Sequence, residues 1–224
     1  MLRVSAIQTP AGVAFLWAGV LAPLLFTGVY VVEGATRPGY DPLRHQVSLL
    51  SLGPGGGIQV ATFLVTGALL IVFAVALRAA LRTGTGASGG PAAIAVCGTG
   101  FVVAGLFSTQ PLFGYPPGTA EGMATSITPA SMLHVTGAGL LFSGLVAAPL
   151  ILGRRWWRDG SRDWAVASFA AGAVVLVCSG ASGGGPSGQL LFPEVSGLLQ
   201  RISLTAGLGW VLAMAVRHLR AAAW

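Results

Sequence analysis

Residues 58–79 read IQVATFLVTGALLIVFAVALRA and contain a single ionisable side chain, Arg78, next to their end. An apolar helix of about 20 residues is long enough to cross the roughly 30 Å hydrocarbon core of a bilayer. A helix also satisfies its own backbone hydrogen bonds where water is absent. This stretch therefore predicts a membrane-spanning helix.

Apolar stretches of similar length recur along the rest of the chain. They lie at residues 12–32, 92–109, 131–151, 164–180 and 197–216. The longest polar connections, 33–57 and 110–130, are too short for an additional soluble domain. Hydrophobic residues make up 54% of the chain, charged residues make up 8%, and the mean hydropathy is +0.80. The sequence predicts an all-α, polytopic membrane protein, a six-transmembrane-helix bundle in which residues 1–224 form a single membrane domain.

The distribution of arginine predicts which side of the membrane each connection occupies, because the chain contains no lysine. One side carries Arg3, Arg78, Arg82, Arg154, Arg155, Arg158, Arg162, Arg217 and Arg220. The opposite connections carry Arg37 and Arg44, and Arg201 lies inside the last span. The positive-inside rule then places both termini in the cytoplasm of a multi-pass protein of the cell (inner or plasma) membrane. The first span exceeds the 7–15-residue core of a signal peptide, so we expect it to be retained.

The first outer connection contains YDPLRHQVSLLSLGPG, residues 40–55, which has the signals of a short helix. Asp41 suits the N-cap, a proline follows it at the first helical position, and glycine and proline stop the helix. At 100° per residue, Arg44 and Ser48 share one face, with His45 at its edge. We expect an amphipathic helix at the outer interface. The alternative is that this segment only plugs the outer end of the bundle.

Further ionisable residues are expected at the same depth. His134 lies near the outer end of the fourth span, and Arg201 lies about one turn inside the sixth. Such side chains cost a few kcal/mol in a membrane, so they usually face the bundle interior and find partners. Asp41 and Glu194 are the expected acceptors for Arg201. The group is either an ion-pair network that holds the helix ends together or part of a ligand site.

Histidine could also give this outer region chemistry. His134 and His45 are candidate bases near neutral pH, and Ser48 is a candidate nucleophile beside one of them. The two histidines could instead join a carboxylate as metal ligands. No HxxxH, HExxH or CxxC spacing supports a metal, so neither a metal nor another cofactor is predicted.

Several segments together resemble the DUF998 family of six-span bacterial membrane proteins. They are PGYDPLRHQVSLLSLGPGG at 38–56, FSTQPLFGYPPG at 107–118, the pair Leu133-His134, and GLLQRISLTAGLGW at 197–210. The resemblance implies the six-span fold but brings no activity with it. It also implies that Arg44, His45, Ser48, His134 and Arg201 belong to the family pattern.

The chain departs from that pattern after the third span. Family members often have an acidic residue there, where this chain has Ser108, Thr109 and Gln110. If a carboxylate at that place were catalytic or bound a metal, this chain would lack it.

Three functions stay open. We favour an outward-facing polar pocket that binds a lipid headgroup or a small anionic ligand, because arginine recognises phosphate and carboxylate well. The expected ligand-binding residues are Asp41, Arg44, His45, Ser48, His134, Glu194 and Arg201. The second function is an outer-leaflet lipid hydrolase or transferase with a histidine base, with or without a metal. The third is a transporter. The sequence shows no charged residue near the membrane midplane and no inverted repeat, and both observations disfavour it.

Membrane lipids are the expected partners, together with a small anionic ligand. The net charge of +6 does not predict nucleic-acid binding, because the basic residues are spread over loops at a membrane surface that itself carries anionic lipid. Small residues such as Gly137 and Gly144 predict close helix packing, either within the chain or in a homo-oligomer.

Overall fold

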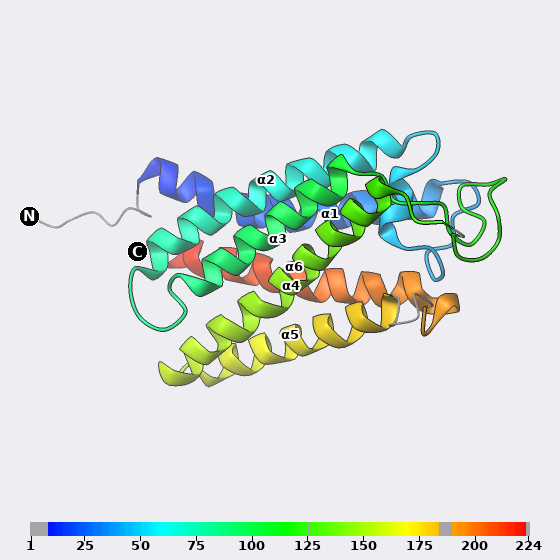
Figure 1. Ribbon diagram of the computed structural model, residues 1–224. Helices are drawn as coiled ribbons and strands as arrows, with labels where there is room; N and C mark the ends of the chain where they lie inside the picture. The colour runs from blue at the N-terminus through cyan, green and yellow to red at the C-terminus, as the bar shows by residue number, and fades with distance from the viewer. Residues whose placement is uncertain (1–8, 125, 184–189, 223–224) are drawn as a thin grey trace, which may run out of the picture.

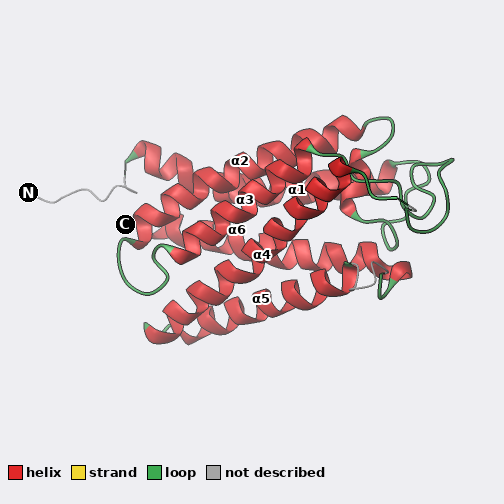
Figure 2. Ribbon diagram, viewed as in Figure 1, coloured by secondary structure: helices red, strands yellow, loops and turns green. Residues whose placement is uncertain are grey.

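The computed structural model describes residues 9–124, 126–183 and 190–222. Its six long helices are α1 (Pro10–Thr36), α2 (Gly56–Leu81), α3 (Gly89–Leu106), α4 (Pro129–Arg158), α5 (Arg162–Ser182) and α6 (Ser196–Ala222). Two 3-10 helices, η2 (Val47–Ser51) and η3 (Pro193–Val195), lie in the connections, and the described residues form no strand (Figure 2). All six long helices are long and apolar enough to cross a membrane, which confirms the predicted all-α, six-span class.

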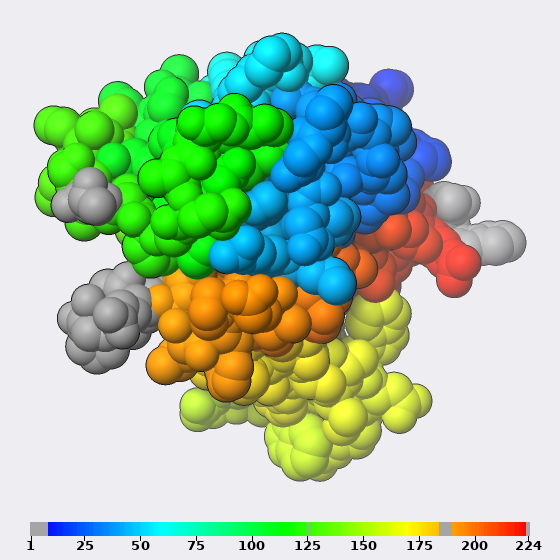
Figure 3. Space-filling model, turned by 90° about the vertical axis from the view of Figure 1, so that its right-hand side faces the viewer, coloured from blue at the N-terminus to red at the C-terminus, as the bar shows by residue number. Residues whose placement is uncertain are grey.

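The helices form a closed ring in chain order. Each packs against the next, and α6 returns to pack against α1. The start of α1 and the end of α6 lie at one end of the bundle (Figure 1). We call the opposite end, which carries residues 37–55, 107–124, 126–128 and 190–195, the looped end. Figure 3 views that end, where the first two segments (blue and green) lie together and the third (orange) lies beside them.

The observed helices match the predicted spans, with two extensions. Helix α4 continues past the expected end at 151 to Arg158, and α6 continues past 216 to Ala222. The prediction followed hydropathy, whereas a helix can continue beyond the hydrocarbon into the polar interface. Arg155 illustrates this, because its guanidinium donates to the backbone oxygens of Thr83 and Thr85 in the connection between α2 and α3. Arg3, counted in the predicted sidedness, lies outside the described residues.

The short helix of the first connection is present, but it is a buried 3-10 helix limited to Val47–Ser51. The side chain of Asp41 accepts a hydrogen bond from the Leu43 N–H, as a cap does, at 2.9 Å. Gln46 is extended, with ψ at 150°, so no continuous helix runs from 41 to 53. Leu49 and Leu50 are almost completely buried. The segment thus plugs the bundle end, the alternative considered above, instead of lying on the interface.

Helices α3 and α4 meet through glycine, which confirms the predicted close packing within the chain. A Cβ atom on Gly137 would lie 2.6 Å from the Ala104 backbone nitrogen. One on Gly144 would lie 2.5 Å from the Ala93 carbonyl oxygen. Backbone atoms this close leave no room for a side chain, so the seam fixes α4, and His134 with it, against the end of α3.

Candidate functional site

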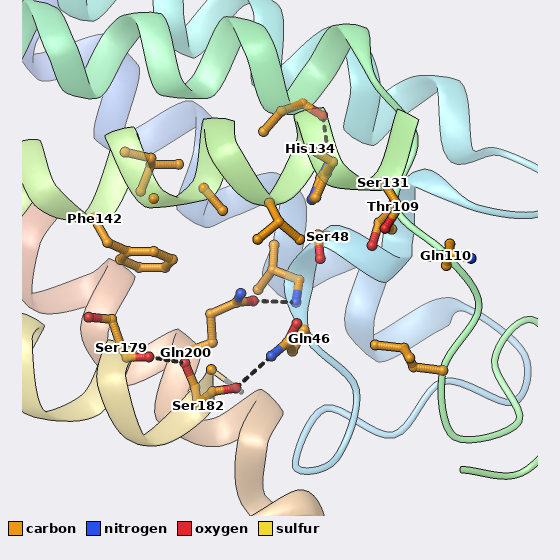
Figure 4. A pocket seen from close by; sticks show the side chains of 18 of the residues that line it. Gln46, Ser48, Thr109, Gln110, Ser131, His134, Phe142, Ser179, Ser182 and Gln200 are labelled. Carbon is orange, nitrogen blue, oxygen red and sulfur yellow. Dashed lines mark hydrogen bonds between the residues drawn. The ribbon is translucent and has the colours of Figure 1, made fainter. Parts of the chain in front are cut away.

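A cavity of about 840 Å³ lies at the looped end of the ring, between α4 and α6 (Figure 4). Its apolar walls include Phe26, Phe63, Leu141, Phe142 and Leu204. Two further lining residues are largely exposed, Val135 on α4 at 63% and Ile127 just before that helix at 72%. The cavity therefore opens along the edge of a membrane-spanning helix. Its volume lies within the roughly 300–1,000 Å³ of pockets that enclose a drug-sized ligand.

The polar lining side chains form two groups. One group contains Ser48, Thr109, Gln110, Ser131 and His134. The other contains Gln46, Ser179, Ser182 and Gln200. Among the described residues that line the cavity, none is Asp, Glu, Lys or Arg. The cavity therefore offers neutral hydrogen-bonding groups on an apolar background.

His134 is held by the end of α3. Its Nδ1 lies 2.8 Å from the Ala104 carbonyl oxygen and 3.0 Å from that of Phe107. Helix C-termini leave such carbonyls without intrahelical partners. Because a carbonyl only accepts, Nδ1 must carry the hydrogen, and in the neutral ring Nε2 keeps a lone pair. His134 is only 4% exposed, and Figure 4 shows its ring reaching into the cavity above Ser48.

Two glutamines complete the other polar group. The Gln200 side-chain oxygen accepts from the Val47 N–H at 2.7 Å, which leaves its amide nitrogen as a donor. The Gln46 amide nitrogen donates to the Ser182 carbonyl oxygen at 2.7 Å, which leaves its side-chain oxygen as an acceptor. Both side chains line the cavity, as Figure 4 shows. Each amide is thus oriented by one backbone partner.

His45 does not line the cavity. Its Nδ1 accepts from the Asp41 N–H at 2.9 Å, and its Nε2 donates to the Phe113 carbonyl oxygen at 3.0 Å. The ring also packs against Tyr40 and Tyr115. With both nitrogens engaged, His45 ties two loops together and is a poor base or metal ligand in this arrangement. In the described part of the chain, no three His, Cys, Asp or Glu side chains come close enough to hold a metal.

Arg201 binds backbone oxygens instead of the expected carboxylates. Its Nη1 donates to the carbonyl oxygens of Pro42 at 2.6 Å, His45 at 2.9 Å and Gly197 at 3.0 Å. Its Nη2 donates to the Tyr40 hydroxyl. We call these five residues the Arg201 clasp. Where we expected Asp41 or Glu194 as the partner of Arg201, neither forms an ion pair with it within the described residues.

Tyr40 is the polar centre of the clasp. Its hydroxyl donates to the His45 carbonyl oxygen at 2.9 Å. Burial raises the pKa of Tyr40 to about 12, against the opposing effect of the Arg201 charge. The phenol therefore stays protonated at neutral pH and relays the arginine's hydrogen bond to the loop.

The remaining charged residues lie at the rim of the looped end. The Arg44 guanidinium lies 3.3 Å from a Glu121 oxygen and 3.8 Å from a Glu194 oxygen. It also lies over the Phe113 ring, 4.9 Å from its centre. Both glutamate side chains are mostly exposed, at 74% and 78%. Of the seven expected ligand-binding residues, only Ser48 and His134 line the cavity.

The family model described as "Protein of unknown function (DUF998)" matches residues 20–217, a stretch that includes the cavity and the whole Arg201 clasp. The chain belongs to the DUF998 family. This confirms the resemblance found in the sequence motifs. No curated protein and no solved structure matches the chain.

Sequence reasoning predicted only two of the residues that line the cavity of this DUF998 protein, Ser48 and His134. The polar lining residues that it did not predict include Gln46, Gln200, Ser131 and Thr109. Their side chains are neutral amides and hydroxyls. The signal that could have found Gln200 is an amide inside an otherwise apolar span, next to Arg201. A buried amide in a membrane helix needs a partner for the same reason as a charge does, although the cost is smaller.

Proposed function

We propose that this DUF998 protein binds a lipid-like amphiphile, with an apolar chain in the cavity and a polar group against the side chains at the looped end. The supporting observation is the cavity itself, because its walls are apolar and its open edge lies along α4. Transfer of a chain from water to such walls contributes about 0.8 kcal/mol per buried CH₂. A lipid that is already dissolved in the bilayer gains less free energy from entering the cavity than one transferred from water. The polar contacts must therefore supply the selectivity.

We also propose that the looped end faces away from the cytoplasm of a bacterial inner membrane. Support comes from the positive-inside rule. The helix ends and connections at the other end carry Arg78, Arg82, Arg154, Arg155, Arg158, Arg162, Arg217 and Arg220. A ligand would then enter from the outer leaflet.

Filling the cavity should prevent binding. Gly139 lines it, and a Cβ atom there would meet nothing within 4 Å, so Gly139→Trp places an indole in the cavity without a backbone clash. The probes are a monoacylglycerol and a lysophosphatidylglycerol whose identical chains carry a diazirine, added to the protein in nanodiscs. Irradiation should crosslink at least one of them to cavity-lining peptides. Gly139→Trp should lower that labelling about tenfold, the effect of losing 1.4 kcal/mol.

The matched control is Gly28→Trp, an exposed position of α1 that is outside the cavity and equally unobstructed. It should leave labelling unchanged. Equal labelling of wild type and Gly139→Trp, or crosslinks confined to outward surfaces of the helices, would refute cavity binding.

A lipid hydrolase is the second candidate, and the lone pair of His134 Nε2 favours it. The Ser48 hydroxyl makes no hydrogen bond to any residue that the structure describes and faces the same space. Ser48 Oγ would attack an ester carbonyl while His134 Nε2 takes its proton. The alcohol would leave with that proton, and water would then release the acyl group from Ser48.

A fluorophosphonate probe tests this candidate directly. It should phosphonylate Ser48, identified by peptide mass spectrometry, and labelling should disappear in Ser48→Ala and slow strongly in His134→Gln. Thermal unfolding of both variants serves as the folding control. Folded wild-type protein that leaves Ser48 unlabelled would exclude a serine hydrolase of this kind.

A further inference from the structure

We infer that the cavity selects a single-chain amphiphile with a neutral polar group, such as a monoacylglycerol or another hydroxyl-bearing ester or amide, over one with an anionic headgroup. This inference rests on the proposed function and names its ligand class. It differs from the anionic ligand expected from the sequence, because the residues that led to that expectation lie elsewhere in the structure.

The first argument is electrostatic. None of the described lining residues is Asp, Glu, Lys or Arg, and His134 is the one titratable side chain among them. An anion buried among them would lose its hydration without gaining a cationic partner, which is strongly unfavourable. A neutral head group loses much less hydration free energy when it is buried.

The arginines of the looped end have partners outside the cavity. The two terminal nitrogens of Arg201 donate to three carbonyl oxygens and one phenol. Arg44 faces Glu121 and Glu194 at the rim. Arg37 binds Glu33 and the carbonyl oxygens of Leu52 and Pro54. A phosphate inside the cavity would meet no guanidinium, because none of the described lining residues is an arginine.

The second argument is the mixture of donors and acceptors. The Gln200 amide nitrogen remains a donor, whereas the Gln46 side-chain oxygen and His134 Nε2 remain acceptors. The Ser48 hydroxyl can do either. A phosphate or carboxylate only accepts, so it would set its negative charge against two lone pairs. A hydroxyl next to an ester or amide can donate to the acceptors and accept from Gln200.

The third argument is size. The cavity of about 840 Å³ falls in the range that encloses one drug-sized molecule, so it fits one acyl chain with a small head better than a two-chain phospholipid. The exposed Val135 at its edge marks where the chain can pass between cavity and bilayer.

The experiment compares the two photoprobes described above, which share one diazirine-bearing chain and differ in the head. In wild-type protein, half-maximal labelling of the cavity peptides should need at least about tenfold less monoacylglycerol than lysophosphatidylglycerol. Labelling that Gly139→Trp removes counts as cavity labelling. Ionic strength is held constant, because surface attraction of the anionic probe depends on salt.

A gain-of-charge variant provides the second readout. Thr109 lines the cavity at its looped end and is only partly buried, so Thr109→Arg adds a cation there with little effect on packing. It should shift the preference toward lysophosphatidylglycerol by about tenfold. Gly28→Arg, which carries the same charge outside the cavity, should not.

The outcomes separate the two proposals. Equal labelling by both probes, or better labelling by lysophosphatidylglycerol, overturns selection of a neutral head while cavity binding stands. Cavity labelling by neither probe overturns both. A preference for monoacylglycerol that Thr109→Arg reduces by about tenfold, and Gly28→Arg leaves unchanged, supports the inference.

Discussion

Gly137→Ala is expected to lower the midpoint of thermal unfolding by about 6 °C. The added Cβ atom would lie 2.6 Å from the Ala104 nitrogen and 2.9 Å from the Gly100 carbonyl oxygen. These are backbone atoms, so α3 and α4 must move apart to accept it. Overpacking typically costs about 1–3 kcal/mol, and each kcal/mol corresponds to about 2–4 °C at this chain length. Close van der Waals contact is also what holds helices together in lipid.

The control is Gly139→Ala, two residues further along the same helix, where a Cβ atom meets nothing within 4 Å. Alanine is a better helix former than glycine by about 1 kcal/mol, so this variant should unfold at the same or a higher temperature. Both are measured by intrinsic tryptophan fluorescence in one detergent. Equal midpoints for the two variants would mean that the α3–α4 seam is looser than described.

Arg201→Gln is expected to destabilise the protein by about 4 kcal/mol, or about 10 °C in the unfolding midpoint. The substitution removes the donor shared by the Pro42, His45 and Gly197 carbonyl oxygens and the Tyr40 hydroxyl. Glutamine is shorter and has two N–H donors, so most of these oxygens lose their partner. Lysine should not restore stability, because a single ammonium cannot reproduce the planar fork.

Arg44→Gln is the matched control, because it makes the same substitution at the same end of the bundle. Arg44 faces two largely exposed glutamates, and such surface pairs contribute about 0–1 kcal/mol. The midpoint of thermal unfolding of Arg44→Gln should therefore fall by no more than about 3 °C. A larger loss from Arg44→Gln than from Arg201→Gln would reverse the structural roles assigned to these two arginines.

The six spans were predictable because hydrophobic length reports directly on membrane crossing. His134 was predictable for a related reason, since an ionisable residue in a span must have a partner or a role. The partners of Arg201 were not predictable from the sequence. Arg201 binds backbone carbonyl oxygens, and every residue has one, so no sequence pattern distinguishes Pro42, His45 and Gly197 as acceptors.

The cavity was hidden for a different reason. Ser48 and His134 are far apart in the chain and line the same cavity only because η2 lies at the end of the helix ring. The sequence prediction relied mainly on ionisable residues, yet five of the seven candidates lie at the looped end outside the cavity. The neutral amides of Gln46 and Gln200 took the cavity positions instead.

The Arg201 clasp also determines when, during synthesis, the looped end can be completed. It joins a loop after the first helix to the start of the sixth, and chains are synthesised and inserted from the N-terminus. Until the ribosome has delivered α6, the Pro42 and His45 carbonyls lack their guanidinium and the cavity lacks its Gln200 side. Five inserted helices are therefore an unfinished assembly, and the cavity is complete only when the last helix enters the membrane.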